Sequence, residues 1–184
     1  SLRDSLGAKV ISVFGTGCCG DINHVDPTRS ERNTAEFIGE SLGGTILKGL
    51  PELTDVRETS LQVRTQQVQL PLQDATQPEV ERAVQIVELA RGGGKVDFFE
   101  HVTAYKKLIL DQFRHQQPFV NSPDHITWGL SRTLAGIGDE LPVDVTVFTI
   151  GTDVAIVCLP GEVFVDLGLA IKRASPFRTT LVIE

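Results

Sequence analysis

The amino-acid sequence predicts an α/β protein, with α+β as the alternative, in which helices pack on a mixed β-sheet. Two observations carry this prediction. Short runs rich in β-branched residues alternate with segments whose apolar residues recur every three or four positions, and two of these runs near the C-terminal end are separated by only three residues. Alternating strands and helices favour crossover connections and a three-residue loop favours a hairpin, so the sheet should contain parallel and antiparallel neighbours.

The first two predicted elements are a strand and a helix. Lys9–Phe14 (KVISVF) is short and apolar and ends at Gly15, as expected of a buried strand. Ser30–Leu50 carries an apolar stripe at helical spacing. We therefore expect a helix there, capped by its first residue or by Asn33 and stopped by Pro51.

A strand and two helices are predicted next. Thr59–Leu72 alternates as a strand does, but its apolar parity switches near Gln66-Gln67, which predicts a β-bulge or a break. Thr76-Gln77-Pro78-Glu79 fits a capping box that opens a helix, and the run of glycines after Arg91 ends it. A further helix is expected over Val96–Phe113, with one apolar face formed by Phe98, Val102, Tyr105, Ile109 and Phe113.

The last third is predicted to start irregularly and to end in a hairpin, a helix and a strand. Pro118–Gly138 is irregular, with a short helix near Thr127–Leu134. The elements expected after it are strands Val143–Ile150 and Val154–Leu159, helix Val163–Ala174 and strand Arg178–Glu184.

Length and composition bound the class of protein. With 184 residues, 41% hydrophobic and 22% charged, the chain fits one globular domain. The lack of any methionine and a last strand without a tail predict that residues 1–184 belong to a larger domain truncated at both ends. A net charge of −7 argues against nucleic-acid binding. The sequence has no run of eighteen apolar residues, so it predicts no membrane-spanning helix.

The spacing of the cysteines and histidines matches no complete metal-binding or disulfide motif. Cys18 and Cys19 are adjacent, so they are poorly placed to pair with each other, and Cys158 reads as a small buried hydrophobe. Neither a C-x-x-C pair nor an H-E-x-x-H helix occurs. His101 and His115 are expected on or at the end of a helix, and His125 lies in the irregular stretch, from which it can reach a site.

The segment Gly15–His24 (GTGCCGDINH) is the strongest candidate for a functional loop. Its three glycines follow a predicted strand end, where α/β proteins bind ligands, and they allow a turn whose backbone N–H groups can form an anion-binding nest. Asp21, Asn23 and His24 then supply a carboxylate, an amide and an imidazole that can polarise a carbonyl or move a proton. The alternative is an Asx-turn in which Asp21 and Asn23 bond only the local backbone.

Glu162 is the second candidate. It follows an apolar strand and a Pro160-Gly161 turn, at the start of a predicted helix. Acidic residues are favoured there by the helix dipole, at about 0.3–1 kcal/mol, and by spacing alone this is the simpler explanation. The functional alternative makes Glu162 a metal ligand or an acid/base group at the carboxyl edge of the sheet.

In its motifs the chain resembles the N-terminal catalytic domain of the neutral/alkaline non-lysosomal ceramidases, particularly the shorter ceramidase-like proteins of bacteria. The matching segments keep the family's order and spacing over nearly the whole length. They are Phe14–His24 (FGTGCCGDINH), Ile38–Leu42 (IGESL), Val154–Phe164 (VAIVCLPGEVF), Leu167–Lys172 (LGLAIK) and Ser175–Phe177 (SPF).

The resemblance implies a zinc-dependent hydrolase. Neutral ceramidases cleave the amide bond of ceramide to sphingosine and a fatty acid, using one zinc ion held by two histidines, a glutamate and a tyrosine. Glu162 matches the glutamate ligand. The family's histidines fall upstream of this chain and its tyrosine downstream of Glu184, so the resemblance makes residues 1–184 one part of a larger catalytic domain. It also implies a lipid or other small-molecule substrate and a secreted or periplasmic location.

The nucleophile loop departs from the family. Where the family has Gly-Asp-Val-Ser-Pro-Asn, with a serine regarded as the nucleophile, this chain has Gly20-Asp21-Ile22-Asn23-His24-Val25. An amide at position 23 cannot attack a carbonyl. The expectation is that zinc-bound water attacks instead, because zinc lowers its pKa to about 7. Asp21, Asn23 and His24 would form the wall opposite Glu162, with Asn23 donating to an oxyanion and His24 moving a proton.

The alternatives to this function are another amide or ester substrate, or a catalytically inactive binding or structural domain.

Overall fold

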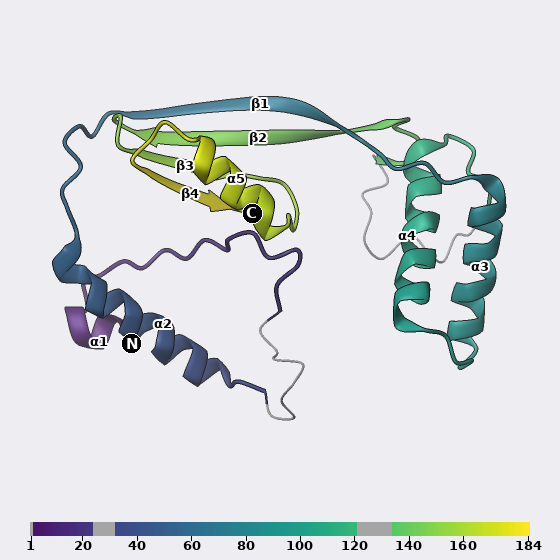
Figure 1. The fold of residues 1–184 in the computed structure, drawn as a ribbon, viewed down its shortest axis with the longest axis horizontal. Helices are drawn as coiled ribbons and strands as arrows, with labels where there is room; N and C mark the ends of the chain where they lie inside the picture. The colour runs from purple at the N-terminus through teal and green to yellow at the C-terminus, as the bar shows by residue number, and fades with distance from the viewer. Residues whose placement is uncertain (1, 24–31, 121–133) are drawn as a thin grey trace. The chain divides into compact units, whose positions relative to one another are not determined.

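The computed structural model describes residues 2–23, 32–120 and 134–184 (Figure 1). Its strands form one mixed sheet in the order β1-β2-β3-β4, which confirms the predicted α/β class. The chain divides into two compact units, residues 1–66 with 144–184 and residues 67–143. The elements are α1 (Leu2–Leu6), α2 (Ala35–Gly49), the 3₁₀ turn η1 (Leu50–Glu52), β1 (Leu61–Pro71), α3 (Gln77–Arg91), α4 (Phe98–Arg114), β2 (Glu140–Ile150), β3 (Val154–Cys158), α5 (Val165–Ala174) and β4 (Thr179–Ile183).

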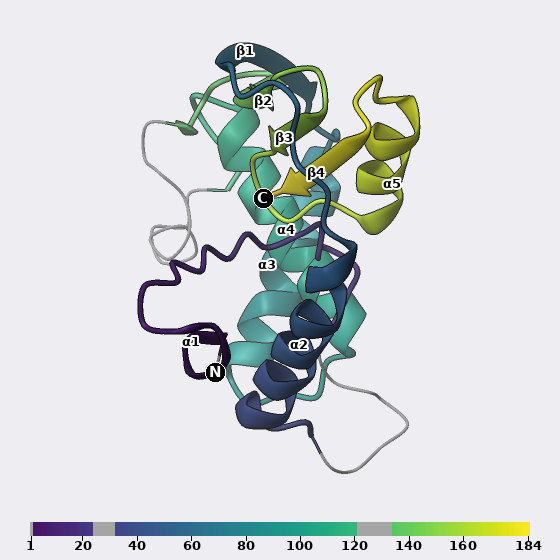
Figure 2. The same cartoon turned by 90° about the vertical axis from the view of Figure 1, so that its left-hand side faces the viewer.

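The first unit contains the predicted hairpin and the mixed part of the sheet. β2 and β3 are antiparallel, with Ile150 opposite Val154, and the loop between them starts at Gly151 with a positive φ of 53°. β4 lies parallel to β3, with Val154 opposite Thr179, and α5 makes the crossover between them. Figure 2 shows α5 beside β4. This arrangement brings the chain that follows β3 and the chain that follows β4 to the same edge of the sheet.

The predicted strand over Lys9–Phe14 is wrong. These residues are neither helical nor extended in a ladder, and Val13 and Phe14 are largely exposed. The segment meets the sheet only after Phe14, where Glu184 N–H donates to Thr16 O over 3.1 Å. A strand forms only where a neighbour satisfies its backbone groups, and no such ladder reaches Lys9–Phe14 within the described residues.

The helix predicted over Ser30–Leu50 is present but shorter. α2 begins at Ala35, and its cap is Thr34, whose hydroxyl accepts from Phe37 N–H over 3.2 Å. Neither Ser30 nor Asn33 is the cap. Residues 24–31, which include Ser30, lie outside the described part of the chain. No residue of α2 is buried, and Ile38, Leu42 and Ile46 of its apolar stripe remain partly exposed.

β1 is one continuous strand, which rules out the break, one of the two alternatives predicted near Gln66-Gln67. The Thr65 and Thr146 hydroxyls lie 2.9 Å apart, and Gly151 N–H donates to Ser60 O over 2.8 Å, as expected of antiparallel β1 and β2. The parity switch falls where the strand passes from the first compact unit to the second.

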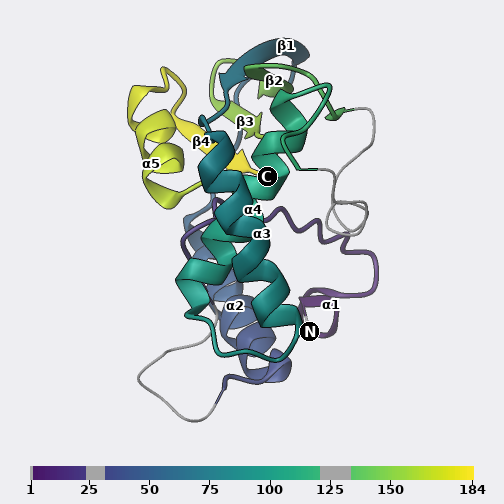
Figure 3. The ribbon, with the colours of Figure 1, turned by 90° about the vertical axis from the view of Figure 1, so that its right-hand side faces the viewer.

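The second unit is built on the antiparallel helices α3 and α4, which run side by side (Figure 3). The capping box predicted for α3 is present: the N–H and hydroxyl of Thr76 donate to the Glu79 carboxylate over 2.9 and 2.8 Å. The Lys107 ammonium group, followed by these two bonds, lowers the pKa of Glu79 to about 2. The buried core of this unit consists of Ala75, Val80, Ala83, Val87, Ala104 and Leu108.

The buried face of α4 differs from the predicted apolar face. The buried residues are Ala104, Leu108, Asp111 and Gln112, whereas Phe98 is 69% exposed. Ala104 and Leu108 pack into the apolar cluster that includes Val80, Ala83 and Val87 of α3. Asp111 is buried where it bonds to the chain that follows α4, at Phe119 N–H and Val120 N–H.

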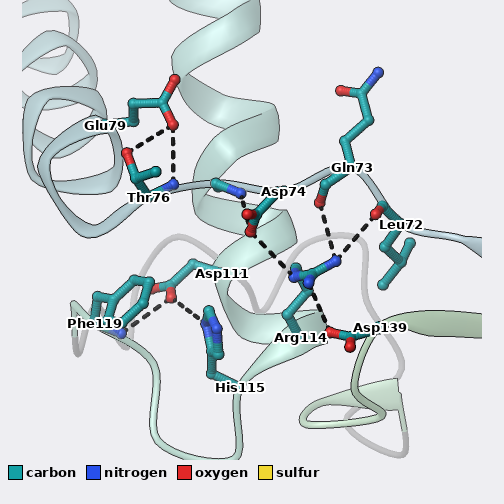
Figure 4. A network of polar contacts seen from close by, with 11 residues as sticks. Leu72, Gln73, Asp74, Thr76, Glu79, Asp111, Arg114, His115, Phe119 and Asp139 are labelled. Atoms are coloured by element: carbon teal, nitrogen blue, oxygen red, sulfur yellow. Dashed lines mark hydrogen bonds and ion pairs between the residues drawn. The ribbon is translucent and has the colours of Figure 1, made fainter.

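Two side chains of α4 organise the ends of the second unit (Figure 4). Arg114 donates to Leu72 O over 3.0 Å and pairs with Asp139 over 2.6 Å, so it joins the segment before α3 to the segment before β2. Asp111 is 1% exposed and accepts from His115 Nδ1 over 2.9 Å and from Phe119 N–H over 3.0 Å.

Two further predictions concern the irregular stretch and the membrane. The helix expected near Thr127–Leu134 lies almost wholly outside the described residues, as does His125. Within residues 2–23, 32–120 and 134–184, no helix is long and apolar enough to cross a bilayer.

Candidate functional site

The Gly15–Asn23 loop and the Glu162 turn lie against each other in the first unit. Gly20 N–H donates to Val163 O over 2.9 Å. A Cβ placed on Gly20 would stand 2.3 Å from the Glu162 carbonyl oxygen and 3.0 Å from the Phe164 ring. Only glycine permits so close an approach, which gives this position a physical reason for lacking a side chain. Two segments more than 130 residues apart in sequence therefore form one surface.

The Glu184 carboxylate bridges the same two segments. Its Oε1 accepts from Cys19 N–H over 2.7 Å, and its Oε2 accepts from Val163 N–H over 2.6 Å. Hydrogen bonds from the Cys19 thiol, from Val163 N–H and from Cys19 N–H lower the pKa of Glu184 against a smaller desolvation effect. The carboxylate is therefore ionised at neutral pH.

The same contact makes Cys19 a poor nucleophile. The hydrogen bond to Glu184, with burial and the negative charges of Glu184 and Glu162, raises the pKa of the Cys19 thiol to about 11. A thiol with such a pKa stays protonated at neutral pH, and only the thiolate attacks. Cys18 has a packing role, since its sulfur fills the space beside Gly168 of α5, where an added Cβ would stand 2.5 Å away.

Asp21 binds the start of helix α5. Its Oδ1 accepts from Val165 N–H, the first residue of the helix, over 2.9 Å. This bond satisfies one of the four N–H groups that a helix leaves open, and it places a negative charge at the positive end of the helix dipole. Asp21 therefore stabilises the contact between the loop and α5.

Glu162 differs from both neighbouring acids. Its side chain is exposed, and within the described residues its carboxylate has no hydrogen bond or ion pair. Glu184 uses both oxygens and Asp21 uses one on backbone N–H groups, so only Glu162 keeps both free for a ligand. A carboxylate in this state suits a metal position, although the described residues contain no group of three or more His, Cys, Asp and Glu arranged to hold an ion.

Three N–H groups of the loop are not available for the anion-binding nest that its glycines suggest. Cys19, Gly20 and Ile22 each donate their N–H to a protein acceptor, namely Glu184 Oε1, Val163 O and Cys19 O. Backbone donors bonded in this way cannot also bind a substrate anion. At these three positions an oxyanion would need a side-chain donor instead.

Asn23 is the candidate for that donor. Its side chain is exposed, it lies three residues after Gly20, and it makes an interaction within the protein. His24 lies outside the described residues. Of the four predicted site residues, the fold therefore brings the loop carrying Asp21 and Asn23 to the turn carrying Glu162.

A serine-containing motif lies elsewhere in the first unit. Gly39-Glu40-Ser41-Leu42-Gly43 has the G-x-S-x-G spacing of a nucleophile elbow. It lies inside α2, where the Ser41 carbonyl accepts from the Thr45 hydroxyl over 2.9 Å. A nucleophile elbow requires a sharp strand-to-helix turn, so this match has no such role.

The sequence analysis missed two groups of interacting side chains: Glu184, and the pair Asp111 and His115. Glu184 stands directly after an apolar strand, and a charge at that place is a usable sequence signal for a role at the sheet edge. Asp111 and His115 are four residues apart on one helix, a spacing that brings side chains together. Their pairing belongs to the second unit and fixes the chain after α4.

The comparisons with known proteins add no relative: no family model, no curated protein and no solved structure matches this chain.

Proposed function

We propose that this chain forms one wall of a zinc-dependent hydrolase site of the neutral ceramidase type, which cleaves the amide bond of an N-acyl lipid. The observation that supports it is the contact between the Gly20 loop and the Glu162 turn, with Gly20 N–H on Val163 O at 2.9 Å. The resemblance requires a nucleophile loop and a zinc glutamate at one site, and these are the two segments in contact.

The chemistry of the side chains fits the roles proposed for them. Glu162 offers an exposed carboxylate that bonds nothing else within the described residues and so suits zinc. The resemblance puts the other three ligands outside residues 1–184. Zinc, when bound, supplies an activated water and polarises the carbonyl. Asn23 stands where the family has serine, and its amide N–H group donates to the oxyanion that develops as the amide carbonyl is attacked. His24 follows it as the group that passes a proton to the leaving amine.

Glu162→Ala is expected to remove zinc from the complete protein, because it deletes the ligand that the resemblance assigns to this chain. Zinc content measured by atomic emission after dialysis should fall from one equivalent to near zero, and amide hydrolysis should fall with it. Glu58→Ala, an exposed acidic residue elsewhere in the same unit, is the matched control and should keep its zinc. Equal zinc in the wild type and in Glu162→Ala would rule out the ligand role.

Asn23→Ala is expected to lower kcat by about 10²–10³-fold with little change in KM, as loss of one oxyanion donor does. Asn23→Ser, which restores a short donor, should recover part of this loss. Both values come from steady-state hydrolysis of a fluorogenic N-acyl substrate by the zinc-loaded protein. An Asn23→Ala variant with unchanged kcat would show that position 23 takes no part in the chemistry.

Two alternatives follow from the loop itself. The replacement of serine by Asn23, together with the use of Asp21 and three loop N–H groups by the fold, favours an inactive binding or structural domain as the second candidate. A different amide or ester substrate on the same zinc site is the other. A panel of N-acyl and ester substrates separates them: amide turnover supports the proposal, ester turnover alone supports the second substrate class, and no turnover with bound zinc supports the inactive domain.

A further inference from the structure

Three segments of the first unit meet at Glu184. Its backbone N–H donates to Thr16 O over 3.1 Å, and the preceding residue, Ile183, accepts from Leu159 N–H over 2.8 Å. The end of β4 is therefore pinned between the loop that begins at Thr16 and the turn that follows β3. From this fixed backbone the Glu184 side chain reaches both neighbours.

The two side-chain bonds of Glu184 are the shortest contacts between these segments. Cys19 N–H and Val163 N–H donate to different oxygens of one carboxylate, over 2.7 and 2.6 Å. Bonds to an ionised acceptor are roughly twice as strong as neutral ones. Val163 also accepts from Gly20 N–H over 2.9 Å, so both polar groups of the residue next to Glu162 are bound to this cluster.

We infer that Glu184 is a positioning residue of the proposed site: its carboxylate locks the Gly15–Asn23 loop to the Glu162 turn and so sets the place of the Glu162 side chain opposite Asn23. The role in catalysis rests on the proposed function, whereas the lock itself rests on the two hydrogen bonds. Glu184 acts through the backbone of Cys19 and Val163 and does not touch the substrate or the metal. Groups that orient a metal ligand in this way commonly change metal affinity by about 10–100-fold when removed.

The test replaces one of the two Glu184 carboxylate oxygens that accept from Cys19 N–H and Val163 N–H. Glu184→Gln keeps the size of the side chain, but its NH₂ group faces one of the two N–H donors and cannot accept from it. Glu184→Asp keeps the charge but is one methylene shorter, so it cannot span both donors. Glu79→Gln is the matched control, since Glu79 also accepts from a backbone N–H, that of Thr76, but belongs to the second unit.

Two measurements on the complete protein decide the outcome. Amide hydrogen exchange followed by NMR should show Cys19 or Val163 exchanging at least about tenfold faster in both Glu184 variants, with the α3 and α4 amides unchanged as proof of folding. Zinc alone, titrated against a competing chelator, should bind about 10–100-fold more weakly, while Glu79→Gln should match the wild type in both measurements.

Each failure has its own signature. If Glu184→Gln keeps wild-type zinc affinity while Glu162→Ala loses it, the positioning role is overturned and the proposed function stands. If the wild type binds no zinc, the proposed function fails, and the positioning role fails with it. In either case the two amides still report on the lock: exchange at the wild-type rate in Glu184→Gln would overturn it as well.

Discussion

Gly20→Ala is expected to separate the loop from the Glu162 turn and to abolish most of the activity proposed for this site. The added methyl would stand 2.3 Å from the Glu162 carbonyl oxygen and 3.0 Å from its carbonyl carbon. Both are backbone atoms, which cannot rotate away as the end of a side chain can. The loop must move, and the bond from Gly20 N–H to Val163 O is lost with that movement.

The size of the effect follows from the type of clash. Overpacking of this kind costs about 1–3 kcal/mol of the free energy of unfolding. A displacement of about 1 Å between catalytic groups can lower the rate by about 10²-fold. Urea unfolding and steady-state hydrolysis measure the two effects, and zinc titration shows whether Glu162 has moved.

Gly17→Ala is the control for Gly20→Ala. It lies in the same loop, but its added Cβ would meet nothing closer than Val182 O at 3.9 Å, an ordinary van der Waals distance. Its stability and activity should remain close to those of the wild type. If the two variants behave alike, the close approach at Gly20 has no special importance for the site.

Asp111→Ala is expected to give the largest loss of stability in the second unit. The carboxyl group is 1% exposed and accepts from His115 Nδ1, Phe119 N–H and Val120 N–H over 2.9, 3.0 and 3.3 Å. Alanine leaves these donors without their acceptor and opens a small cavity. We expect a loss of about 2–4 kcal/mol in the free energy of unfolding, since each unsatisfied buried group costs about 1–3 kcal/mol.

Asp97→Ala is the matched comparison on the same helix. Asp97 accepts from Phe99 N–H and Glu100 N–H at the N-terminus of α4, over 2.9 and 3.1 Å, but it is exposed. Water replaces those bonds, so the loss should be about 1 kcal/mol, as for other helix caps. Urea unfolding followed by circular dichroism measures both variants. Equal losses would show that burial of Asp111 adds nothing.

Local sequence signals predicted most elements well. The capping box at Thr76, the hairpin around Gly151 and the crossover helix α5 each depend on residues within a few positions of one another. Such features need no information about distant segments, because the hydrogen bonds that define them close locally. The α/β class and the mixed sheet followed from their order.

The failures share a dependence on distant neighbours. Lys9–Phe14 has the composition of a strand, but no ladder partner reaches it in the described part of the chain. The face of α4 that carries Asp111 is buried although it is not the most apolar, because the chain after α4 returns to bond with this carboxylate. Propensity describes what a segment can form, and its neighbours select the outcome.

For the candidate site, the residue types and the resemblance came from the sequence alone: a glycine loop with Asp21, Asn23 and His24, and the acid Glu162. The tertiary structure then showed which of these groups the fold uses and which remain available for a ligand. Asp21 is bound to α5, three loop N–H groups are used by the fold, and Glu184 joins the two segments. Of these three acids, Glu162 is the one whose oxygens bond nothing within the described residues. The physical reason is that a carboxylate can either satisfy backbone donors or bind a ligand, and only the spatial arrangement shows which donors lie within reach.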